Sequence, residues 1–501
     1  MKKLLTFGAA AILGCYCLKV SAQEKKLSNL TKEDFISDFK LAVDILKKQH
    51  PNPYKFIDAA VFEQKVDSLL KGMAQTKDIY ACLQYSPVYL IRDVHTSLRL
   101  SNDNSRELYS SIRFFPFPVV IERGKIFINI KGASIPFGAE VTSINNRPAS
   151  EILNSLATSA YSDGYANTGM DRVYGDFQVV FSLESPMQQS YQVSYVMPGS
   201  TETKKITLPA AGPTQAYHAT RQAVYPYNLL QHAYYIYNDY FDDTQTGLLT
   251  VNTFAINEAD AYKEFSEFFK EVNKRKYKQV IIDIRNNGGG NPAISALLYS
   301  FMTTGPFRNV YNYRTRTIDI AYPEYAVAEN GRRLSDEDIQ SQKNFFYQRF
   351  DKDTTGFFVG NARLRDGLLE NFPPDKDVFH GKVFVLTGGG TVSAATYFAS
   401  LVQKNKRGEI IGKETGSGAE ATTAAWFTRY LLPKTKCVLT VPLSELYFFN
   451  ATTDKGRGIL PDEEVPMNKF IEYIQAGKDP EIAYTLDLIT SGGKTVPARK
   501  R

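Results

Sequence analysis

Two apolar segments in the second half of the chain each lead directly into a loop that contains three consecutive glycines. Residues 278–284 precede Gly288–Gly290, and residues 382–386 precede Gly388–Gly390. A helical pattern begins after each loop. Strands that alternate with helices in this way predict an α/β core. Both loops are candidate parts of a site, because glycine lets the backbone approach a ligand closely and a helix N-terminus favours negative charge.

The rest of the chain divides into regions with different hydrophobic periodicity. Residues 28 to about 100 show helical spacing, with a capping signal at Thr31 and further helical stretches at about 60–73 and 77–91. Short strand patterns follow, with a hairpin signal at Arg123-Gly124. A chain of 501 residues is too long for one core, so we predict a multidomain α/β protein. Its predicted segments are a signal peptide (1–22), an N-terminal helical region (23–105), a β-rich module (106–212), a connector (213–245), an α/β core (246–475) with an insertion (308–375), and a C-terminal tail (476–501).

The N-terminus has the pattern of an export signal. Lys2 and Lys3 precede an apolar run, and Val20-Ser21-Ala22 supplies small residues for cleavage. The run is short for a membrane span of about 20 residues, and no later segment is apolar enough to span a bilayer. A lipid anchor at Cys15 is the alternative, although Leu13 fits a lipoprotein signal poorly. We expect export to the periplasm, the cell envelope or the extracellular space.

Charge and cysteine content narrow the class of protein. The formal net charge is +6, but seven positive charges lie in the signal peptide and the last eight residues. The remaining chain is nearly neutral, which argues against a nucleic-acid-binding face. After signal removal only Cys82 and Cys437 remain, and their separation predicts two buried thiols rather than a disulfide framework or a metal site.

The second glycine loop ends in a serine at the start of a helix. Neither loop has the Lys-Ser/Thr ending of a P-loop, and neither fits G-x-G-x-x-G, because Ala293 and Ser393 stand at the last position. G-x-S-x-G is also absent. A serine here, beside the N–H of Ala394, suits a nucleophile next to an oxyanion donor. The alternative, which local sequence alone favours, is an ordinary N-cap serine.

A nucleophilic serine needs a base, and His95 is the best candidate among five histidines. It lies in Asp93-Val94-His95-Thr96, where the helical pattern changes to a strand pattern, and it has an acid nearby. A loop histidine beside an acid is better placed for proton transfer than one on a helix face. The alternative is a structural or surface histidine.

Four separated segments together resemble the family of tail-specific, or C-terminal-processing, serine proteases. Arg285–Gly290 resembles its R-N-N-x-G-G loop, and Gly389–Ala395 resembles its nucleophile segment. Asp93–Thr96 resembles its D-G-H-T box, and Gly456–Asp462 resembles its G-x-G-I-x-P-D ending. Phe137–Leu153 is also similar to the second half of the family's PDZ-like domain. The resemblance runs from about residue 30 to 470 and implies a PDZ-like module before a crotonase/ClpP-like catalytic core.

The resemblance implies that Ser393 is the nucleophile and that Gly289 and Ala394 supply oxyanion N–H groups. Members with a lysine base carry it in an F-G-K-G segment, where this chain has glycine, and Lys413 lies upstream of that position. The branch that includes the tricorn core protease uses a histidine base, which matches His95. That branch also has a glutamate before the G-x-G-I-x-P-D ending, where this chain has Lys455 with Asp454 adjacent. The acid that orients the histidine therefore stays open among Asp454, Asp93 and Glu414.

We therefore predict an exported serine endopeptidase that acts on peptides or proteins through a Ser–His acyl-enzyme mechanism. The resemblance implies no metal and no cofactor. The PDZ-like module would present an extended peptide by strand addition. The alternative is a catalytically inactive member of the same fold that binds peptides or apolar ligands, because fold does not fix function. A crotonase-type acyl-CoA enzyme shares a related core, but export argues against access to CoA.

Overall fold

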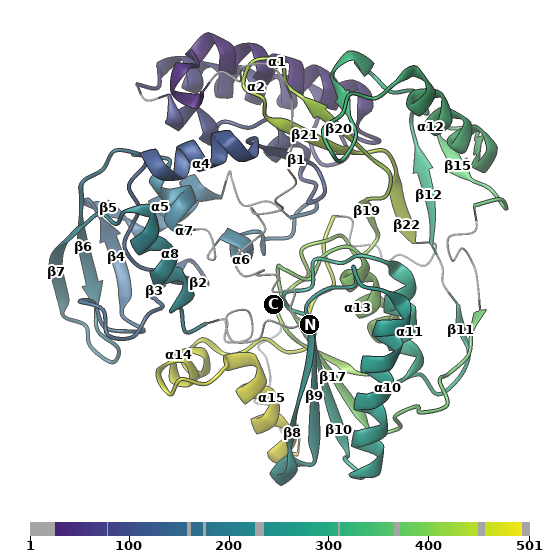
Figure 1. Ribbon diagram of the computed structural model, residues 1–501. Coiled ribbons are helices and arrows are strands. Elements are labelled where there is room, and N and C mark those ends of the chain that lie inside the picture. The colour runs from purple at the N-terminus through teal and green to yellow at the C-terminus, as the bar shows by residue number, and fades with distance from the viewer. Residues whose placement is uncertain are drawn as a thin grey trace, which may run out of the picture.

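The computed structural model describes residues 26–77, 79–157, 162–173, 177–225, 235–308, 311–364, 371–448 and 456–492. The predicted signal peptide, Cys15 and Asp454 lie outside these residues. Figure 1 shows three regions arranged around a centre: N-terminal helices, a β-rich module and an α/β core. The prediction of a multidomain α/β protein is confirmed.

The core is built on a five-stranded sheet with the order β18-β17-β10-β9-β8. Four of its strands are parallel: β9 (Thr246–Val251), β10 (Gln279–Asp283), β17 (Lys382–Thr387) and β18 (Glu409–Gly412). The antiparallel edge strand is β8 (Ile236–Phe241). Parallel sheets need apolar cover on both faces, which is why β10 is a continuous apolar run. The carboxyl ends of β10 and β17 carry the two glycine loops.

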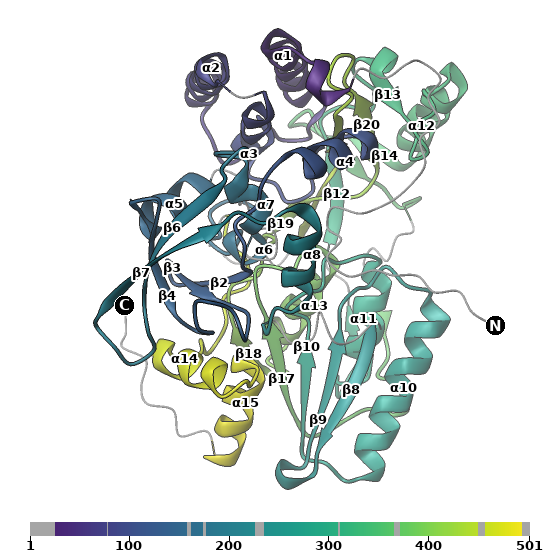
Figure 2. The ribbon, with the colours of Figure 1, turned by 60° about the vertical axis from the view of Figure 1, so that its left-hand side comes forward.

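Helices cover both faces of this sheet. Alternate residues such as Leu249 and Ile282 pack under α10 (Glu258–Lys274), α11 (Pro292–Ser300) and α13 (Ala394–Lys404). The opposite face, with Leu248 and Ile281, packs against Leu488 of α15 (Pro480–Thr490). Figures 1 and 2 agree that α10 and α15 lie on opposite sides of the strands. Residues 480–490, which we predicted to belong to a C-terminal tail, are therefore a covering layer of the core, preceded by α14 (Met467–Gln475).

The N-terminal region contains α1 (Lys32–Gln49), α2 (Ala59–Gln75), α3 (Val88–Ile91) and α4 (Asn102–Ser111). The capping prediction is confirmed, because the Asp34 N–H donates to Thr31 Oγ1 while Asp34 Oδ2 accepts from the Thr31 N–H. The helix predicted at 77–91 is wrong. A 3-10 turn (Tyr80–Gln84) and the short α3 take its place, separated at Pro87, which disfavours helix at the preceding residue.

Strands from the core cross into the N-terminal region. β1 (Ser97–Arg99), β21 (Val438–Pro442), β20 (Phe427–Leu431) and β13 (Ala326–Val327) form one sheet. Tyr430 and Leu439 are buried in the same apolar cluster as Phe39 of α1. The predicted insertion is joined to the rest of the core through a shared sheet, because β12 (Tyr311–Thr315) pairs with β22 (Glu445–Phe448). Further elements in this part are α12 (Asp336–Arg349), β11 (Phe307–Arg308), β14 (Phe350–Lys352), β15 (Phe358–Gly360), β16 (Asn371–Phe372) and β19 (Ala421–Thr423).

The β-rich module is a six-stranded sheet with helices packed on it. Its turn at Arg123-Gly124 has positive φ at both residues (47° and 76°), as a tight hairpin turn requires. Ile126 and Tyr191 belong to its buried cluster, which also contains residues of two helices. The elements are β2 (Val119–Glu122), β3 (Lys125–Ile128), β4 (Glu140–Ile144), β5 (Arg147–Pro148), β6 (Ser190–Val196), β7 (Thr203–Pro209), α5 (Ala149–Leu156), α6 (Met170–Val173), α7 (Phe177–Ser182) and α8 (Pro213–Arg221).

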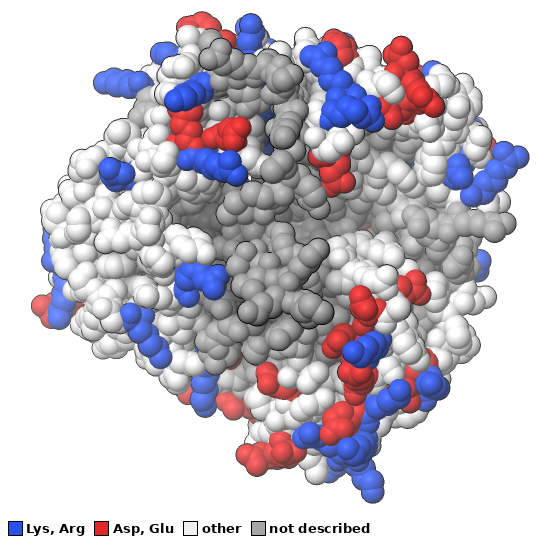
Figure 3. Space-filling model, in the orientation of Figure 1, with Lys and Arg blue, Asp and Glu red and all other residues white. Residues whose placement is uncertain are grey.

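The expectation of two buried thiols is borne out. Cys82 and Cys437 are buried free thiols, and burial raises the pKa of Cys437 to about 12. Figure 3 shows acidic and basic side chains interspersed on the face in view, with no large area of one sign. Among the described helices, none combines the length and apolar character that a bilayer span needs.

Candidate active site

Ser393 stands between β17 and α13 in a backbone conformation that is unusual for a serine. Its φ is 58° and its ψ is −123°, and its side chain makes no capping hydrogen bond. Ser101 and Ser335, at the same position of α4 and α12, have extended-type backbone and do cap their helices. Ser393 therefore does not have the geometry of an ordinary N-cap serine.

The strained backbone of Ser393 is held by its neighbours. The Ser393 N–H donates to Ser417 Oγ at 2.8 Å, and the Val392 N–H donates to the Asn287 carbonyl at 3.0 Å. The Thr391 hydroxyl donates to the Ile284 carbonyl at 2.9 Å. Strain of this kind persists only where surrounding structure fixes it, and it clusters at functional sites.

The two glycine loops meet at this serine. A Cβ atom placed on Gly289 would lie only 2.6 Å from Ser393 Cβ and 3.0 Å from the Ala394 nitrogen. The φ of Gly289 is 93°, which also favours glycine. The predicted site residues Ser393, Gly289 and Ala394 are thus brought together.

The two predicted oxyanion donors differ in their hydrogen bonding. Ala394 is the first residue of α13, so its N–H has no acceptor within the helix. The Gly289 N–H instead donates to Oδ1 of Asn287 at 2.9 Å. Gly289 could stabilise an oxyanion only after this bond is released.

His95 lies in the turn between α3 and β1, and its side chain is 13% exposed. Its Nδ1 faces inward, 3.4 Å from the Thr422 hydroxyl and 3.7 Å from Asp93 Oδ1. The ring stacks on Phe427 with 6.2 Å between ring centroids. Because Nδ1 faces these oxygen atoms, Nε2 is the ring nitrogen left for proton transfer.

Asp93 holds the backbone of the histidine loop. Its Oδ1 accepts from the His95 N–H at 2.8 Å, and its Oδ2 lies 3.1 Å from His50 Nε2 and accepts from the Thr96 hydroxyl at 2.5 Å. Burial alone would raise the pKa of Asp93, but its interactions with His50 and His95 hold it below the usual range. Asp93 is therefore ionised, and both of its oxygens are committed to this loop.

A second buried acid, Asp163, lies beside His95 and was missed by the sequence analysis. It accepts hydrogen bonds from the Val94 N–H (2.9 Å), the Gly418 N–H (3.0 Å) and the Thr422 hydroxyl (2.6 Å). Burial and the charge of Asp93 raise its pKa, while the charge of His95 opposes this shift. Asp163 lies in a loop between α5 and α6, and no motif in the sequence marks it.

Asp93, His95 and Asp163 offer oxygen and nitrogen atoms within 4.8 Å of one another, as a metal site would. The carboxylates, however, already accept hydrogen bonds from backbone and side-chain donors. A metal would have to displace these donors. The cluster is better described as a hydrogen-bonded acid–imidazole network.

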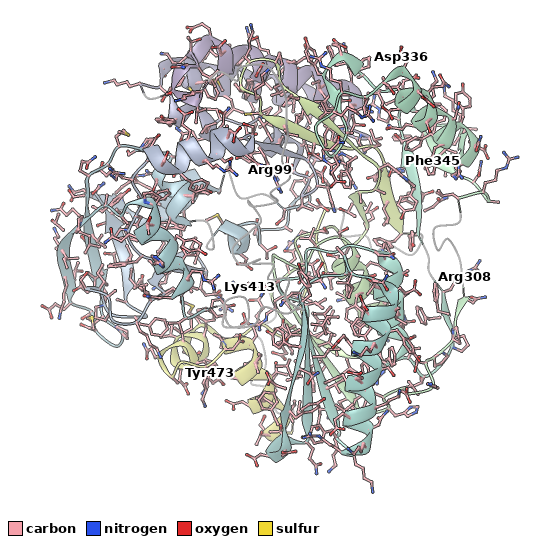
Figure 4. All side chains as sticks on the ribbon, viewed as in Figure 1. Arg99, Arg308, Asp336, Phe345, Lys413 and Tyr473 are labelled. Atoms are coloured by element: carbon pink, nitrogen blue, oxygen red, sulfur yellow. The ribbon has the colours of Figure 1, made fainter. Side chains whose placement is uncertain are left out.

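Glu414 and Lys413 make their contacts elsewhere, and Asp454 lies outside the described residues. Both oxygens of Glu414 accept from the Arg457 guanidinium, at 2.7 and 2.8 Å, and Oε1 also accepts from the Gly458 N–H. Lys413 Nζ lies 2.5 Å from Glu122 and 3.0 Å from Asp171, between the β-rich module and the core (Figure 4). Burial lowers the pKa of Lys413, but the two carboxylates outweigh it and raise the pKa above its usual range. Lys413 is therefore not a base at neutral pH.

Ser393 and His95 are linked through one segment, residues 417–422. Ser417 accepts from the Ser393 N–H, Gly418 donates to Asp163, and Thr422 contacts His95. Within the described part of the chain, no direct hydrogen bond joins the Ser393 and His95 side chains. Catalytic hydrogen bonds are often long in unliganded enzymes and shorten when substrate binds.

A strained serine beside a glycine loop, on a parallel α/β core, defines the class as peptidase-like. Residues 245–465, which are the core, match the model of peptidase family S41. Over these residues the chain is similar to family S41, which includes the tail-specific proteases. No curated protein sequence matches the chain.

Two solved structures of CPAF share the fold over nearly the whole chain. Mature CPAF is 14% identical, with a TM-score of 0.57, and the match covers 93% of this chain and 99% of CPAF. Mature CPAF complexed with lactacystin is also 14% identical, with a TM-score of 0.56 and coverages of 92% and 99%. The photosystem II D1 C-terminal processing protease is 12% identical, covers 90% and 99%, and has a TM-score of only 0.36. At such identities the CPAF structures support the shared fold alone.

Proposed function

We propose that this chain is an exported serine endopeptidase that cleaves peptides or proteins with Ser393 as nucleophile and His95 as base. The observation that carries the proposal is the backbone conformation of Ser393. Its φ is 58°, its side chain makes no capping hydrogen bond, and it lies close to Gly289. A serine can cap a helix without backbone strain, whereas a nucleophile reacts faster when it is fixed in one orientation. The match of the core to a peptidase family agrees with this assignment.

In the proposed reaction, His95 Nε2 takes the proton of Ser393 Oγ as that oxygen attacks the scissile carbonyl carbon. The Ala394 N–H stabilises the tetrahedral oxyanion, joined by the Gly289 N–H once it leaves Asn287. The imidazolium then gives its proton to the leaving amine, and the C–N bond breaks to leave an acyl-enzyme. Water, deprotonated by His95, hydrolyses the ester and restores Ser393.

We further propose that the β-rich module has the PDZ-like role implied by the family resemblance. β7 is the last strand in the order of the module's sheet, so one of its edges can accept an added strand. An extended peptide would bind there through main-chain hydrogen bonds.

A second candidate function is peptide or apolar-ligand binding without catalysis. The observation that favours it is the Gly289 N–H, which already donates to Asn287 Oδ1. An oxyanion site with one donor occupied would be weak, because removing one such donor costs about 10²–10³-fold in rate.

The first experiment is reaction of the mature protein with a fluorophosphonate probe, read by intact mass. We expect one adduct in the parent protein, none in Ser393→Ala and strongly slowed labelling in His95→Ala. Ser335→Ala, which removes an ordinary capping serine, and His218→Ala, at an exposed histidine, are matched controls that should label normally. A folded parent protein that forms no adduct would overturn the peptidase proposal in favour of the binding function.

A further inference from the structure

Thr422 lies between the candidate base and the buried acid that the sequence did not reveal. It belongs to β19 and is buried. Its Oγ1 is 2.6 Å from Asp163 Oδ2 and 3.4 Å from His95 Nδ1. One hydroxyl therefore contacts both groups, and no other side chain in the described residues bridges them.

The direction of the hydrogen bonds follows from the number of protons. The relay uses the ionised form of Asp163: burial and Asp93 raise the pKa of this carboxyl, while the charge of His95 and the hydrogen bonds from Thr422 and the Val94 N–H lower it. In that form the carboxylate only accepts, and a threonine hydroxyl has a single proton to donate. The short contact to Asp163 takes that proton, so the Thr422 lone pair must accept from His95 Nδ1–H. This arrangement places the ring proton on Nδ1 and leaves the Nε2 lone pair free to act as a base.

We propose that Asp163 is the acid that orients and polarises His95, and that it acts through the Thr422 hydroxyl. This inference rests on the proposed peptidase function. Asp163 and Thr422 are positioning residues, since neither would touch the reacting atoms. The negative charge of Asp163 favours the imidazolium that forms when Ser393 gives up its proton.

The other acids fit this role less well. Asp93 Oδ1 is 3.7 Å from His95 Nδ1 and already accepts from the His95 N–H, while its Oδ2 is bound to His50 and Thr96. Glu414 is fully engaged by Arg457 and Gly458. Among the described residues, the charged and titratable groups close to His95 are Asp93, from its own loop, and Asp163, from the module. Beyond them lie His50, which pairs with Asp93, and Arg92, whose Nη1 donates to the Gly164 carbonyl.

The three groups of the relay come from three different regions of the chain. His95 comes from the N-terminal region, Asp163 from the loop between α5 and α6, and Thr422 from β19 beside the core. The base is therefore oriented only when these three regions are packed together. Misplacement of any one would leave the serine present but not activated.

The test compares Thr422→Val, which removes the hydroxyl, with Thr422→Ser, which keeps it. The rate of fluorophosphonate labelling is measured against pH. We expect Thr422→Val to label about 10- to 100-fold more slowly and Thr422→Ser to stay within about threefold of the parent.

The midpoint of the pH profile should also move to lower pH in Thr422→Val, because the imidazolium has lost its link to Asp163. A purely structural defect would lower the rate without moving the midpoint.

Asp163→Asn should lower the labelling rate and move the midpoint of the pH profile in the same way as Thr422→Val. It also disturbs the contacts of Asp163 with Gly418 and Val94, so the comparison of the two Thr422 variants is the decisive test of the relay. Equal labelling rates and midpoints in the parent, Thr422→Val and Thr422→Ser would overturn the relay while leaving the peptidase proposal intact. If the parent does not label at all, the peptidase proposal fails first. The relay is then judged by the ¹⁵N chemical shifts of His95, assigned by their loss in His95→Gln. These should show a proton on Nδ1 in the parent and a mixture of tautomers in Thr422→Val, and a parent protonated on Nε2 would refute the relay.

Discussion

At the level of single residues, the candidate site depends on strained backbone that its neighbours hold in place. A non-glycine residue in the conformation of Ser393 costs about 1–3 kcal/mol. The Ser417 hydroxyl and the Thr391 and Asn287 contacts supply the restraint. From sequence alone, Ser393 was indistinguishable from a capping serine, because both stand at the start of a helix. Only backbone angles separate the two.

Gly289 is the residue that should tolerate a side chain least. Gly289→Ala would place a Cβ 2.6 Å from Ser393 Cβ at a φ of 93°, so the serine must move. We expect labelling of Ser393 to fall at least about 100-fold, because small displacements of a nucleophile have large effects. Unfolding free energy should fall by about 1–3 kcal/mol.

Gly288→Ala is the matched control for this change. Gly288 is adjacent and exposed, has no positive φ, and an added Cβ would meet no atom within 4 Å. Its labelling rate and its urea midpoint should match those of the parent. If Gly289→Ala also labelled at the parental rate, the contact between the two glycine loops would have no functional role.

At the level of elements, what the sequence predicts well is local. The capping box of α1, the Arg123-Gly124 hairpin and the strands that precede the glycine loops all depend on residues close in the chain. The pairing of β1 with β21 joins residues more than three hundred positions apart, and no local pattern encodes it. Asp163 was missed for the same reason, since its partners come from distant segments. Residues 480–490 were misjudged because a short helix close to a basic terminus resembles an unpacked tail.

α15 also carries a buried acid whose protonation should affect stability. Burial raises the pKa of Glu481 to about 7 from an ordinary 4.5, against the pull of Arg285. A carboxyl with a raised folded-state pKa stabilises the folded protein below pH 4.5, and this contribution is lost as pH rises through 7. The corresponding difference is about 3 kcal/mol.

Glu481→Gln should therefore remove part of the pH dependence of folding. We expect its unfolding free energy, from urea titrations of the parent and variant, to change less between pH 5 and 8 than that of the parent. Glu472→Gln, at an exposed acid of α14, is the control and should keep the parental slope. A Glu481→Gln slope equal to the parental slope would show that Glu481 titrates normally in the folded state.

At the level of the whole molecule, the site is formed where three regions meet. The N-terminal region supplies His95, the β-rich module supplies Asp163, and the core supplies Ser393. A shared sheet and partly buried ion pairs join these regions: β1 pairs with β21, and Lys413 of the core pairs with Glu122 and Asp171 of the module. Activity should therefore be more sensitive to contacts between regions than the stability of any single region.

The C-terminal helix tests this view of the molecule as one unit. A mature chain that ends at Gln475 loses α15, which covers one face of the core sheet through Leu488 and pairs with Arg285 through Asp479 and Glu481. Each large apolar side chain removed from such a face costs about 1.5–3 kcal/mol, and Arg285 would be left buried with fewer partners. We expect the chain that ends at Gln475 to bind a hydrophobic dye and to unfold at a much lower urea concentration than the parent. Its Ser393 should label poorly.

A chain that ends at Gly492 keeps α15 and should retain the parental urea midpoint and labelling rate. If both chains behaved alike, α15 would be dispensable, and the prediction of a tail beginning at residue 476 would describe this protein better than the packed helix does.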